Sequence, residues 1–307
     1  MQAIRIHNYG ESDVLQLETI AQPEPQPNEV LIRVEAAGIN PIDWKIRAGY
    51  VKEIFPMPLP FTSGMDVSGT VEAIGADVKA FQVGQAVYGV LKMGAYAEFA
   101  TTPEDAIALK PKTLDFVQAA SVPLVAMTAY QSLFDHADLK AGQTVLIHAA
   151  SGGVGMFAVQ FAKWKGARVI ATASAANAEF VRSLGADQVI DYNATPFEQV
   201  VQNVDVVLDM LGGNTQARSY SVLKPGGILV STAAPPDSKK AEEKGVRAEM
   251  MSRKNSVSLL EEIAGLIDSG QIKTVVAQTF SLSEARQAQE LSQGGHVRGK
   301  IVLQINA

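Results

Sequence analysis

The sequence has no cysteine among its 307 residues, which excludes disulfides, thiolate metal ligands and a catalytic thiol. It also has no uninterrupted apolar run of membrane-spanning length. Pro123 and several polar residues break the charge-free stretch 116–134, where we expect a buried helix or loop. A surplus of basic residues is missing too, because 26 Lys and Arg stand against 32 Asp and Glu. The net charge of -6 argues against nucleic acid or an anionic membrane as the main partner.

A secretory leader pattern is absent as well, since residues 1–6 do not form a basic region followed by an apolar one. What is present is an ordinary globular composition, with 47% apolar and 19% charged residues. A chain of 307 residues is long enough for two domains of usual size. We therefore expect a cytoplasmic protein that binds neither a membrane nor nucleic acid.

The first third of the chain has the pattern of a β-rich domain. Residues 30–35, 68–74 and 96–100 are short strand candidates, and frequent glycines separate them. Short strands with regular turn signals are typical of a small barrel or a sandwich-like domain.

The pattern changes after about residue 114, where apolar strand candidates alternate with helical segments. These strand runs are continuously apolar rather than alternating, as expected when helices cover both faces of a parallel sheet. The alternation therefore predicts a doubly wound α/β domain, followed by a tail of two helices and a strand. The expected strands are 144–148, 168–172, 188–190, 204–210, 227–231 and 300–305, and the expected helices are 156–165, 176–184, 258–268 and 282–291.

A glycine-rich turn follows the first of these strands. Its sequence is Ala150-Ser151-Gly152-Gly153-Val154-Gly155. Such a turn lets backbone N–H groups approach a pyrophosphate without Cβ atoms in the way, and the next helix directs its positive end at the anion. The strand before the turn and the helix and second strand after it are the context of a dinucleotide-binding site. The alternative is a tight strand-to-helix turn without a ligand.

The end of the second strand bears on which dinucleotide is bound. NAD sites usually place an acid there for the ribose 2′-hydroxyl. In this sequence residues 171–177 contain no acid, and the first one after the strand is Glu179. The missing carboxylate permits a 2′-phosphate, to which Thr172, Ser174 and Asn177 could donate hydrogen bonds. The sequence therefore favours NADPH over NADH.

Taken together, the motifs resemble a known family, the medium-chain dehydrogenase/reductases in their zinc-free quinone oxidoreductase branch. The resemblance covers essentially the whole chain. The segments that carry it, besides the glycine turn, are Gly38-Ile39-Asn40-Pro41-Ile42-Asp43, Gly64-Met65-Asp66-Val67-Ser68-Gly69, Val83-Gly84-Gln85-Ala86-Val87-Tyr88-Gly89, Leu184-Gly185-Ala186-Asp187 and Gly295-His296-Val297-Arg298-Gly299-Lys300.

This resemblance implies an α/β protein with a GroES-like β-rich catalytic domain and a Rossmann domain with a doubly wound parallel sheet. The GroES-like domain would comprise residues 1–118, the Rossmann domain residues 119–255, and residues 256–307 would return to the catalytic domain. Homodimers are common in the family, so a homodimer is expected. One departure is the short connection at Lys92-Met93-Gly94, where relatives often have a longer loop.

The resemblance also implies that no metal is bound. Zinc-dependent members of the superfamily have Cys and His ligands at the positions that resemble Asn40 and Met65, and neither residue suits zinc in that role. The four histidines, including His136 and His148, are scattered without metal spacing, and those two are expected to be structural. Without a metal to polarise a carbonyl, the acceptor has to be activated by conjugation, as quinones and α,β-unsaturated carbonyls are.

Several further residues are candidates for the site. Asn40 is expected to donate to cofactor or acceptor, or else to be a turn residue before Pro41; Tyr50 is expected to stack on the acceptor or donate a proton, or else to be a surface tyrosine. By resemblance, the residues that border the cofactor elsewhere are Thr128, Tyr192, Ser231, Thr232 and Ala233, and Arg298 and Lys300 are either cofactor-side cations or parts of a salt-bridged strand.

The leading hypothesis is therefore metal-free, NADPH-dependent reduction of a quinone or an α,β-unsaturated carbonyl by hydride transfer. A 2-enoyl thioester reductase is an alternative, although no basic pocket for a phosphopantetheine group is evident. A non-catalytic NADPH-binding redox sensor is another, and nothing in the sequence opposes it.

Overall fold

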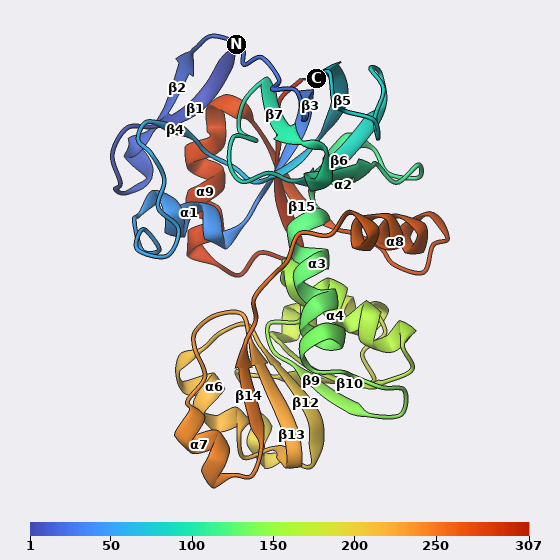
Figure 1. The fold of residues 1–307 in the computed structure, drawn as a ribbon. Helices are drawn as coiled ribbons and strands as arrows, with labels where there is room; N and C mark the ends of the chain where they lie inside the picture. The colour runs from blue at the N-terminus through green and yellow to red at the C-terminus, as the bar shows by residue number, and fades with distance from the viewer. Residues whose placement is uncertain (307) are drawn as a thin grey trace. The chain divides into compact units, whose positions relative to one another are not determined.

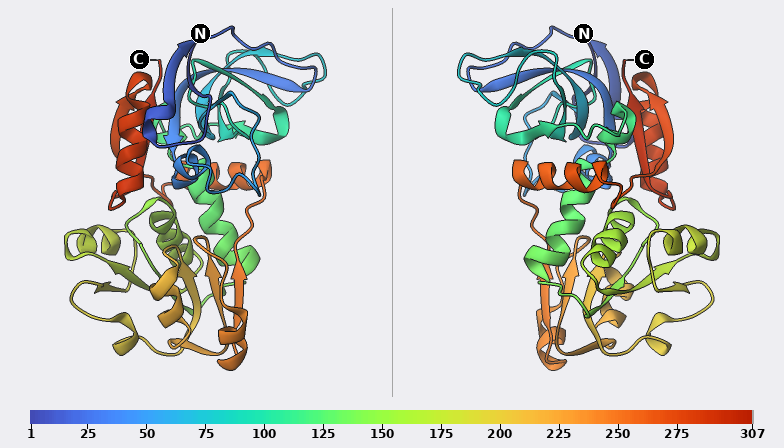
Figure 2. Two further views of the ribbon diagram at one scale, coloured as in Figure 1. Left: turned by 90° about the vertical axis from the view of Figure 1, so that its left-hand side faces the viewer. Right: turned by 90° about the vertical axis from the view of Figure 1, so that its right-hand side faces the viewer.

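The structure is a computed structural model that describes residues 1–306, and the chain forms two compact units. The first unit comprises Met1–Leu124 together with the chain from Asn255 onward, and the second comprises Val125–Lys254. In Figure 1 the blue N-terminal strands and the red C-terminal helix accordingly belong to the same unit, and Figure 2 shows this from two further sides.

The first unit is built on a seven-stranded sheet in the order β15-β16-β3-β5-β6-β8, with β7 paired to β3. Its long central strand β3 alternates between core and partly exposed positions over part of its length and is buried at its carboxyl end. A smaller sheet has the order β2-β1-β4. The strands are β1 (Gln2–Ile6), β2 (Leu15–Thr19), β3 (Glu29–Ile39), β4 (Phe61–Thr62), β5 (Asp66–Ile74), β6 (Ala86–Val90), β7 (Phe99–Pro103), β8 (Ile107–Leu109), β15 (Val276–Ser281) and β16 (Lys300–Gln304).

The pairing of β16 with β3 returns the end of the chain to the N-terminal sheet. The two strands are antiparallel, with Ile301 opposite Ile39 and Leu303 opposite Ala37. Apolar side chains from both strands enter one core cluster. The helices of this unit are α1 (Pro41–Arg47), α2 (Phe116–Ala120), α8 (Val257–Asp268) and α9 (Ala285–Gly294), and α3 (Pro123–Gln131) follows α2.

The second unit is a parallel sheet whose six strands have the order β11-β10-β9-β12-β13-β14. This is the order of doubly wound dinucleotide-binding domains, with a topological switch point between the first and fourth strands, β9 and β12. Val145, Leu146 and Ile147 of β9 are fully buried. The strands are β9 (Thr144–Ile147), β10 (Arg168–Ala173), β11 (Gln188–Asp191), β12 (Val204–Asp209), β13 (Leu223–Ser231) and β14 (Arg247–Met250).

Helices cover both faces of this parallel sheet, as its apolar strands require. The helices are α4 (Gly153–Trp164), α5 (Ala178–Ser183), α6 (Gly213–Ser219) and α7 (Ser238–Glu243). Figure 1 shows α4 on one side of the strands and α6 and α7 on the other, as right-handed crossovers in opposite directions from the switch point demand.

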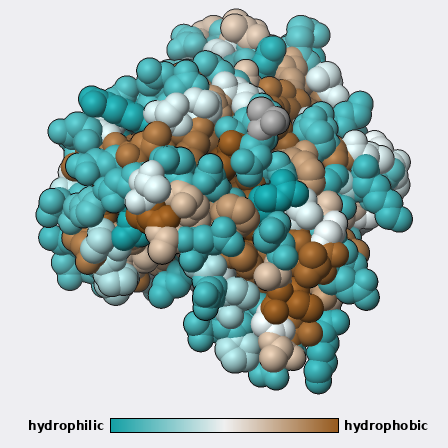
Figure 3. Space-filling view, turned by 90° about the horizontal axis from the view of Figure 1, so that it is seen from above, coloured by the Kyte–Doolittle hydropathy of each residue, from teal (hydrophilic) through white to brown (hydrophobic). Residues whose placement is uncertain are grey.

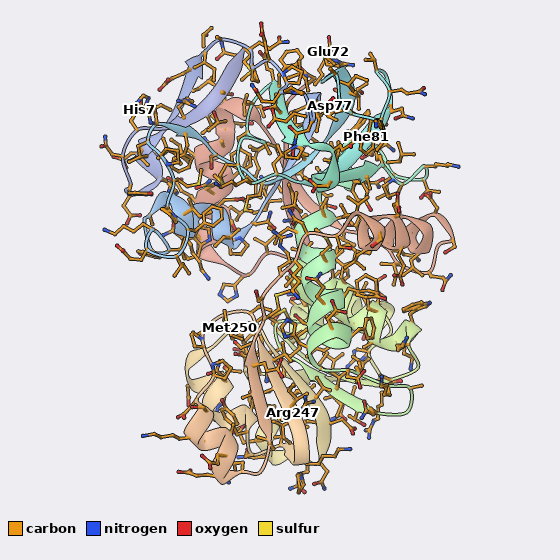
Figure 4. The ribbon with its side chains drawn as sticks, viewed as in Figure 1. His7, Glu72, Asp77, Phe81, Arg247 and Met250 are labelled. Atoms are coloured by element: carbon orange, nitrogen blue, oxygen red, sulfur yellow. The ribbon has the colours of Figure 1, made fainter. Side chains whose placement is uncertain are left out.

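The fold class expected from the sequence is confirmed: a β-rich unit, to which the last strand returns, accompanies a unit with a doubly wound parallel sheet. The strand expected over 96–100 is wrong, because the strand begins only at Phe99 and Tyr96 instead lies buried in the core of its unit. Strand β14 was not predicted. Arg247 and Met250 at its ends are marked in Figure 4, and its short, partly exposed sequence gives no continuous apolar signal.

None of the helices within residues 1–306 is long and apolar enough to cross a bilayer. Seen from above, hydrophilic residues cover much of the visible surface, and hydrophobic residues lie between them in patches (Figure 3).

Candidate functional site

The glycine turn lies at the carboxyl end of β9 and is hydrogen-bonded to both neighbouring strands. The N–H of His148 donates to Leu208 O at 3.1 Å, and the N–H of Ala150 donates to Thr172 O at 3.1 Å. Ala149 adopts the left-handed conformation (φ 48°), which turns the chain into α4. No side chain caps this helix at Gly152, so its first-turn N–H groups are available for an anionic ligand.

Two glycines of this turn have different steric roles. A Cβ at Gly155 would lie 2.3 Å from Ala149 O and 2.6 Å from Ala150 Cα, so only glycine lets the helix start this close to the turn. A Cβ at Gly152 would meet only Ala149 O at 3.4 Å. Gly155 therefore permits packing, whereas the missing side chain at Gly152 leaves the backbone open to a phosphate. The residues present fit a dinucleotide.

Three side chains at the end of β10 were expected to contact a phosphate, and the structure places them in two different surroundings. Asn177 Nδ2 donates to Ser174 Oγ at 3.3 Å, so these two polar side chains lie together beyond the strand. The expectation for the Thr172 hydroxyl is wrong, because Thr172 is 2% exposed and its Oγ1 lies 3.1 Å from His148 Nδ1. The structure assigns that hydroxyl to the histidine rather than to a phosphate.

His148 has a structural role that fixes its tautomer. The Ser219 hydroxyl donates to Thr215 O, so His148 Nε2, 3.0 Å away, is the donor to Ser219 Oγ. Nδ1 then accepts from the Thr172 hydroxyl. Burial lowers the pKa of His148 to about 4, and the neutral ring joins the ends of β9 and β10 to α6.

Asp209 organises the loop at the carboxyl end of β12, a role that the sequence did not reveal. Its fully buried carboxylate accepts hydrogen bonds from the backbone of Leu211 (3.1 Å) and Gly212 (3.0 Å) through Oδ1, and from Gln216 (3.0 Å) and the Ser231 hydroxyl (2.7 Å) through Oδ2. These bonds hold the ends of β12, β13 and the start of α6 in one arrangement.

At the end of β13, two of the residues expected to contact the cofactor already use their backbone N–H groups in hydrogen bonds within the protein. The N–H of Thr232 donates to Asp209 O at 2.9 Å, and the N–H of Ala233 donates to Ser231 Oγ at 3.2 Å. These two N–H groups therefore already have acceptors within the protein. Elsewhere in the same unit, Thr128 is 7% exposed on α3 and Tyr192 is 47% exposed just after β11.

In the first unit, Asn40 lies between a cation and an anion. It is fully buried at the end of β3, where its Oδ1 accepts from Lys300 Nζ at 2.6 Å and its Nδ2 donates to Asp66 Oδ2 at 2.8 Å. Nδ2 has a second hydrogen, and the further acceptor given for it, Gly38 O, lies at the long distance of 3.5 Å. The second Nδ2 hydrogen of Asn40 therefore makes only this long contact, and the side chain is enclosed.

Asp43 is a second buried carboxylate beside this group. Its Oδ2 accepts from the Asn40 N–H at 2.7 Å and from the Tyr96 hydroxyl at 2.6 Å, whereas Oδ1 is buried without a hydrogen-bond partner. Burial raises the pKa of Asp43 to about 7, against the opposing effects of Tyr96, Asn40 and Lys300. Burial likewise raises the pKa of the Tyr96 hydroxyl far above its usual value.

Two further candidates differ in exposure. Tyr50 is 68% exposed, and its ring meets that of Trp44 edge to face with centroids 6.1 Å apart. Lys300 is only 3% exposed and also donates to Ile39 O at 2.6 Å. The interpretation of Lys300 as a cofactor-side cation is therefore wrong, because its ammonium group is enclosed by Asn40, Ile39 and Asp66.

The donor set around Asn40 does not fit zinc. The oxygen of Asn40 already accepts from the lysine ammonium, and Met65 offers only a thioether. Within residues 1–306, no three His, Asp or Glu side chains are grouped so that they could hold a metal ion. His136 contacts Glu249 (Nδ1 to Oε2, 3.1 Å), and His7, marked in Figure 4, contacts Glu18 (2.6 Å).

Two segments of the chain match known protein families. Residues 26–112 match a family described as "Alcohol dehydrogenase GroES-like domain", and residues 184–303 match one described as "Zinc-binding dehydrogenase". The chain is 35% identical to the zebrafish (Danio rerio) "NAD(P)H oxidoreductase RTN4IP1, mitochondrial", covering 99% of this chain and 91% of that protein. It is 33% identical to the pig (Sus scrofa) "Quinone oxidoreductase", covering 99% and 97%.

Solved structures give the same result. The quinone oxidoreductase of Coxiella burnetii is 37% identical with a TM-score of 0.94, covering 100% of this chain and 99% of that one. The quinone oxidoreductase of Escherichia coli complexed with NADPH is 30% identical with a TM-score of 0.91, covering 99% and 100%.

Proposed function

Because this chain belongs to the medium-chain dehydrogenase/reductase superfamily, in its quinone oxidoreductase-like branch, we propose that it reduces a quinone or an α,β-unsaturated carbonyl with NADPH and without a metal. The chain is an NAD(P)H-dependent, quinone oxidoreductase-like reductase. The preference for NADPH, the class of acceptor and the roles of single residues are what we propose.

The observation that carries the proposal is the open glycine turn at the switch point of the parallel sheet. The uncapped start of α4 at Ser151, Gly152, Gly153, Val154 and Gly155 offers N–H groups and a positive helix end to a pyrophosphate. NADPH supplies a hydride when it is bound.

NADPH is proposed over NADH because of the end of β10. Ser174 and Asn177 stand where an acid would otherwise bind the ribose 2′-hydroxyl and repel a 2′-phosphate. The other proposed cofactor contacts are Thr128, Tyr192 and the backbone of Ser231, Thr232 and Ala233.

The acceptor class follows from the side chains available to stabilise a developing negative charge. The proposed donor to a cofactor or acceptor oxygen is the Asn40 Nδ2 group, whose second hydrogen makes only a long contact with Gly38 O, and an amide is a modest donor compared with a metal ion. Such a site suits an acceptor whose conjugation already spreads the charge. The acceptor gains the hydride at one carbon or oxygen and a proton from solvent or from a nearby hydroxyl, for which Tyr50 is the proposed group.

The experiment that tests this proposal is an acceptor profile with metal-depleted protein. NADPH oxidation is expected with a quinone and with an alkenal, and neither chelator nor added zinc should change the rate. Preference for an enoyl-CoA would favour the thioester reductase. Tight NADPH binding without turnover on any acceptor would favour the redox sensor and contradict the proposal.

Two further expectations stay predictions. A homodimer is expected by resemblance, and light scattering of the purified protein tests it. The cytoplasm is the expected compartment; the relatives include proteins whose names place them in mitochondria or in the chloroplast envelope.

A further inference from the structure

We propose that Lys300 is a positioning residue that acts through Asn40: together with Asp66 it fixes the orientation of the Asn40 amide, so that any donation from this side chain to a ligand comes from Nδ2. This inference rests on the proposed function, in which Asn40 touches cofactor or acceptor. It assigns a role in the reaction to a residue from the last strand of the chain.

The three side chains come from three neighbouring strands of one sheet. Asn40 follows the carboxyl end of β3, Asp66 begins β5, and Lys300 begins β16, with β16 and β5 paired to opposite edges of β3. Lys300 and Asp66 are 3% and 0% exposed. The cation therefore reaches Asn40 from one side and the anion from the other, inside one compact unit.

The charges determine which way the amide points. Lys300 Nζ donates to Asn40 Oδ1 at 2.6 Å, and Asn40 Nδ2 donates to Asp66 Oδ2 at 2.8 Å. A flipped amide would place its NH₂ group against an ammonium and its carbonyl oxygen against a carboxylate. Both contacts would be repulsive, and burial strengthens them because little water screens the charges. One amide orientation is therefore strongly favoured.

The backbone at this point has partners besides the lysine, which itself donates to Ile39 O at 2.6 Å. The Asn40 N–H donates to Asp43 Oδ2 at 2.7 Å, and the N–H of Asp43 donates to Asn40 O at 3.0 Å. Removing the ammonium group should therefore release the amide and one bond to Ile39, while these two bonds and the pairing of β16 with β3 still hold the chain. A structural role for Lys300 alone would instead predict a loss of stability with no particular effect on Asn40.

A double-mutant cycle separates these two roles. Lys300→Met should lower kcat/KM for NADPH-dependent reduction by about tenfold or more, and Asn40→Ala should lower it at least as much. The double variant should be no worse than Asn40→Ala alone, within about twofold, because the lysine acts through the amide. Lys79→Met, at an exposed lysine of the same unit, is the matched control and should leave kcat/KM unchanged. Additive losses in the double variant would overturn the proposal.

A second readout needs neither acceptor nor turnover. The side-chain amide signals of Asn40, identified by their loss in Asn40→Ala, should be well separated and slow to exchange in the unmodified protein. In Lys300→Met they should move towards each other and exchange faster. Unchanged amide signals would overturn the proposal, whereas failure of the acceptor profile alone would contradict the proposed function and leave this result standing.

Chemical rescue covers the case in which Lys300→Met folds poorly. Because the chain has no cysteine, Lys300→Cys introduces a single thiol that can be aminoethylated in denaturant before refolding. Aminoethylation restores an ammonium group at nearly the length of lysine, and ethylation restores only the bulk. Recovery of kcat/KM and of the Asn40 signals with the first and not the second is expected; equal recovery with both would contradict the role of the charge.

Discussion

At the scale of single residues, the first unit encloses charged groups that an apolar core would not require. Lys300, Asp66 and Asp43 are all buried around Asn40, and burying charges costs free energy unless each is paired and hydrogen-bonded. Most of their polar atoms do have partners, and Asp43 Oδ1 is an exception. Such a group is better explained by the need to hold one amide in place than by stability.

Removing the Asn40 amide tests its role directly. Asn40→Ala should lower kcat by about 100-fold, the lower end of the roughly 100- to 1,000-fold cost of removing one donor to a developing charge. The fold should persist, because the neighbouring backbone bonds to Asp43 do not involve the amide. Steady-state kinetics and thermal unfolding measure the two effects, and unchanged kinetics would remove Asn40 from the site.

Asp43 gives a prediction on pH and stability. Its pKa in the folded protein, about 7, lies above the ordinary value of 3.8 for an aspartate, so the folded state binds the proton more tightly. Its contribution to the free energy of unfolding is therefore full below about pH 4 and is lost as the pH rises to 7, by about 4 kcal/mol at most.

His148 acts in the opposite sense, because burial lowers its pKa from 6.5 to about 4 and its contribution is lost as the pH falls through that range. The two effects oppose each other in the wild-type protein. Asp43→Asn removes one of them, so its stability should rise with pH between 4 and 7 more steeply than that of the wild type. Urea unfolding at several pH values measures this, and parallel curves for the two proteins would contradict it.

At the scale of elements, the β9–α4–β10 segment combines a packing requirement with a binding requirement. Gly155→Ala would place a Cβ 2.3 Å from Ala149 O, so it should destabilise the second unit and weaken NADPH binding. Gly152→Ala meets only a 3.4 Å contact and should leave stability nearly unchanged while it weakens binding by blocking the backbone. Unfolding midpoints and fluorescence titration with NADPH distinguish the two; equal destabilisation by both would contradict this division of roles.

The end of β10 should determine the choice between NADPH and NADH. Ser174→Asp introduces the missing carboxylate, which should repel the 2′-phosphate and lower the NADPH-to-NADH ratio of kcat/KM by about tenfold or more. Ser174→Asn has the same shape without the charge and serves as the control. An unchanged ratio in the aspartate variant would show that the 2′-phosphate is bound elsewhere.

The elements also show which parts of the fold can be predicted from sequence. The strands β9 and β12 are predictable because both of their faces are covered, which makes them continuously apolar. Strand β14 is not, because a short edge strand with partly exposed residues lacks that pattern. Thr172 was misassigned because its partner, His148, looks unremarkable until β9 and β10 are placed side by side.

At the scale of the whole molecule, the sequence motifs identify the family, but they do not reveal how the network around Asn40 is assembled. Lys300 meets Asn40 across 260 positions of sequence through the pairing of β16 with β3. No local pattern encodes that pairing. Asn40, Asp43, Asp66 and Lys300 all lie in motifs that the sequence shows, but the burial of the lysine and its contact with Asn40 required the structure.

The central claim concerns the chain's chemistry as a whole: a metal-free site that passes hydride only to an activated acceptor. The most direct measurement uses metal-depleted protein and NADPH deuterated at the transferred position, with an enone and the matching saturated ketone offered in parallel. Hydride transfer to an activated acceptor should place deuterium at the β-carbon of the enone, with no reduction of the saturated ketone and no response to zinc. Reduction of both acceptors at similar rates, or activity that depends on added zinc, would contradict it.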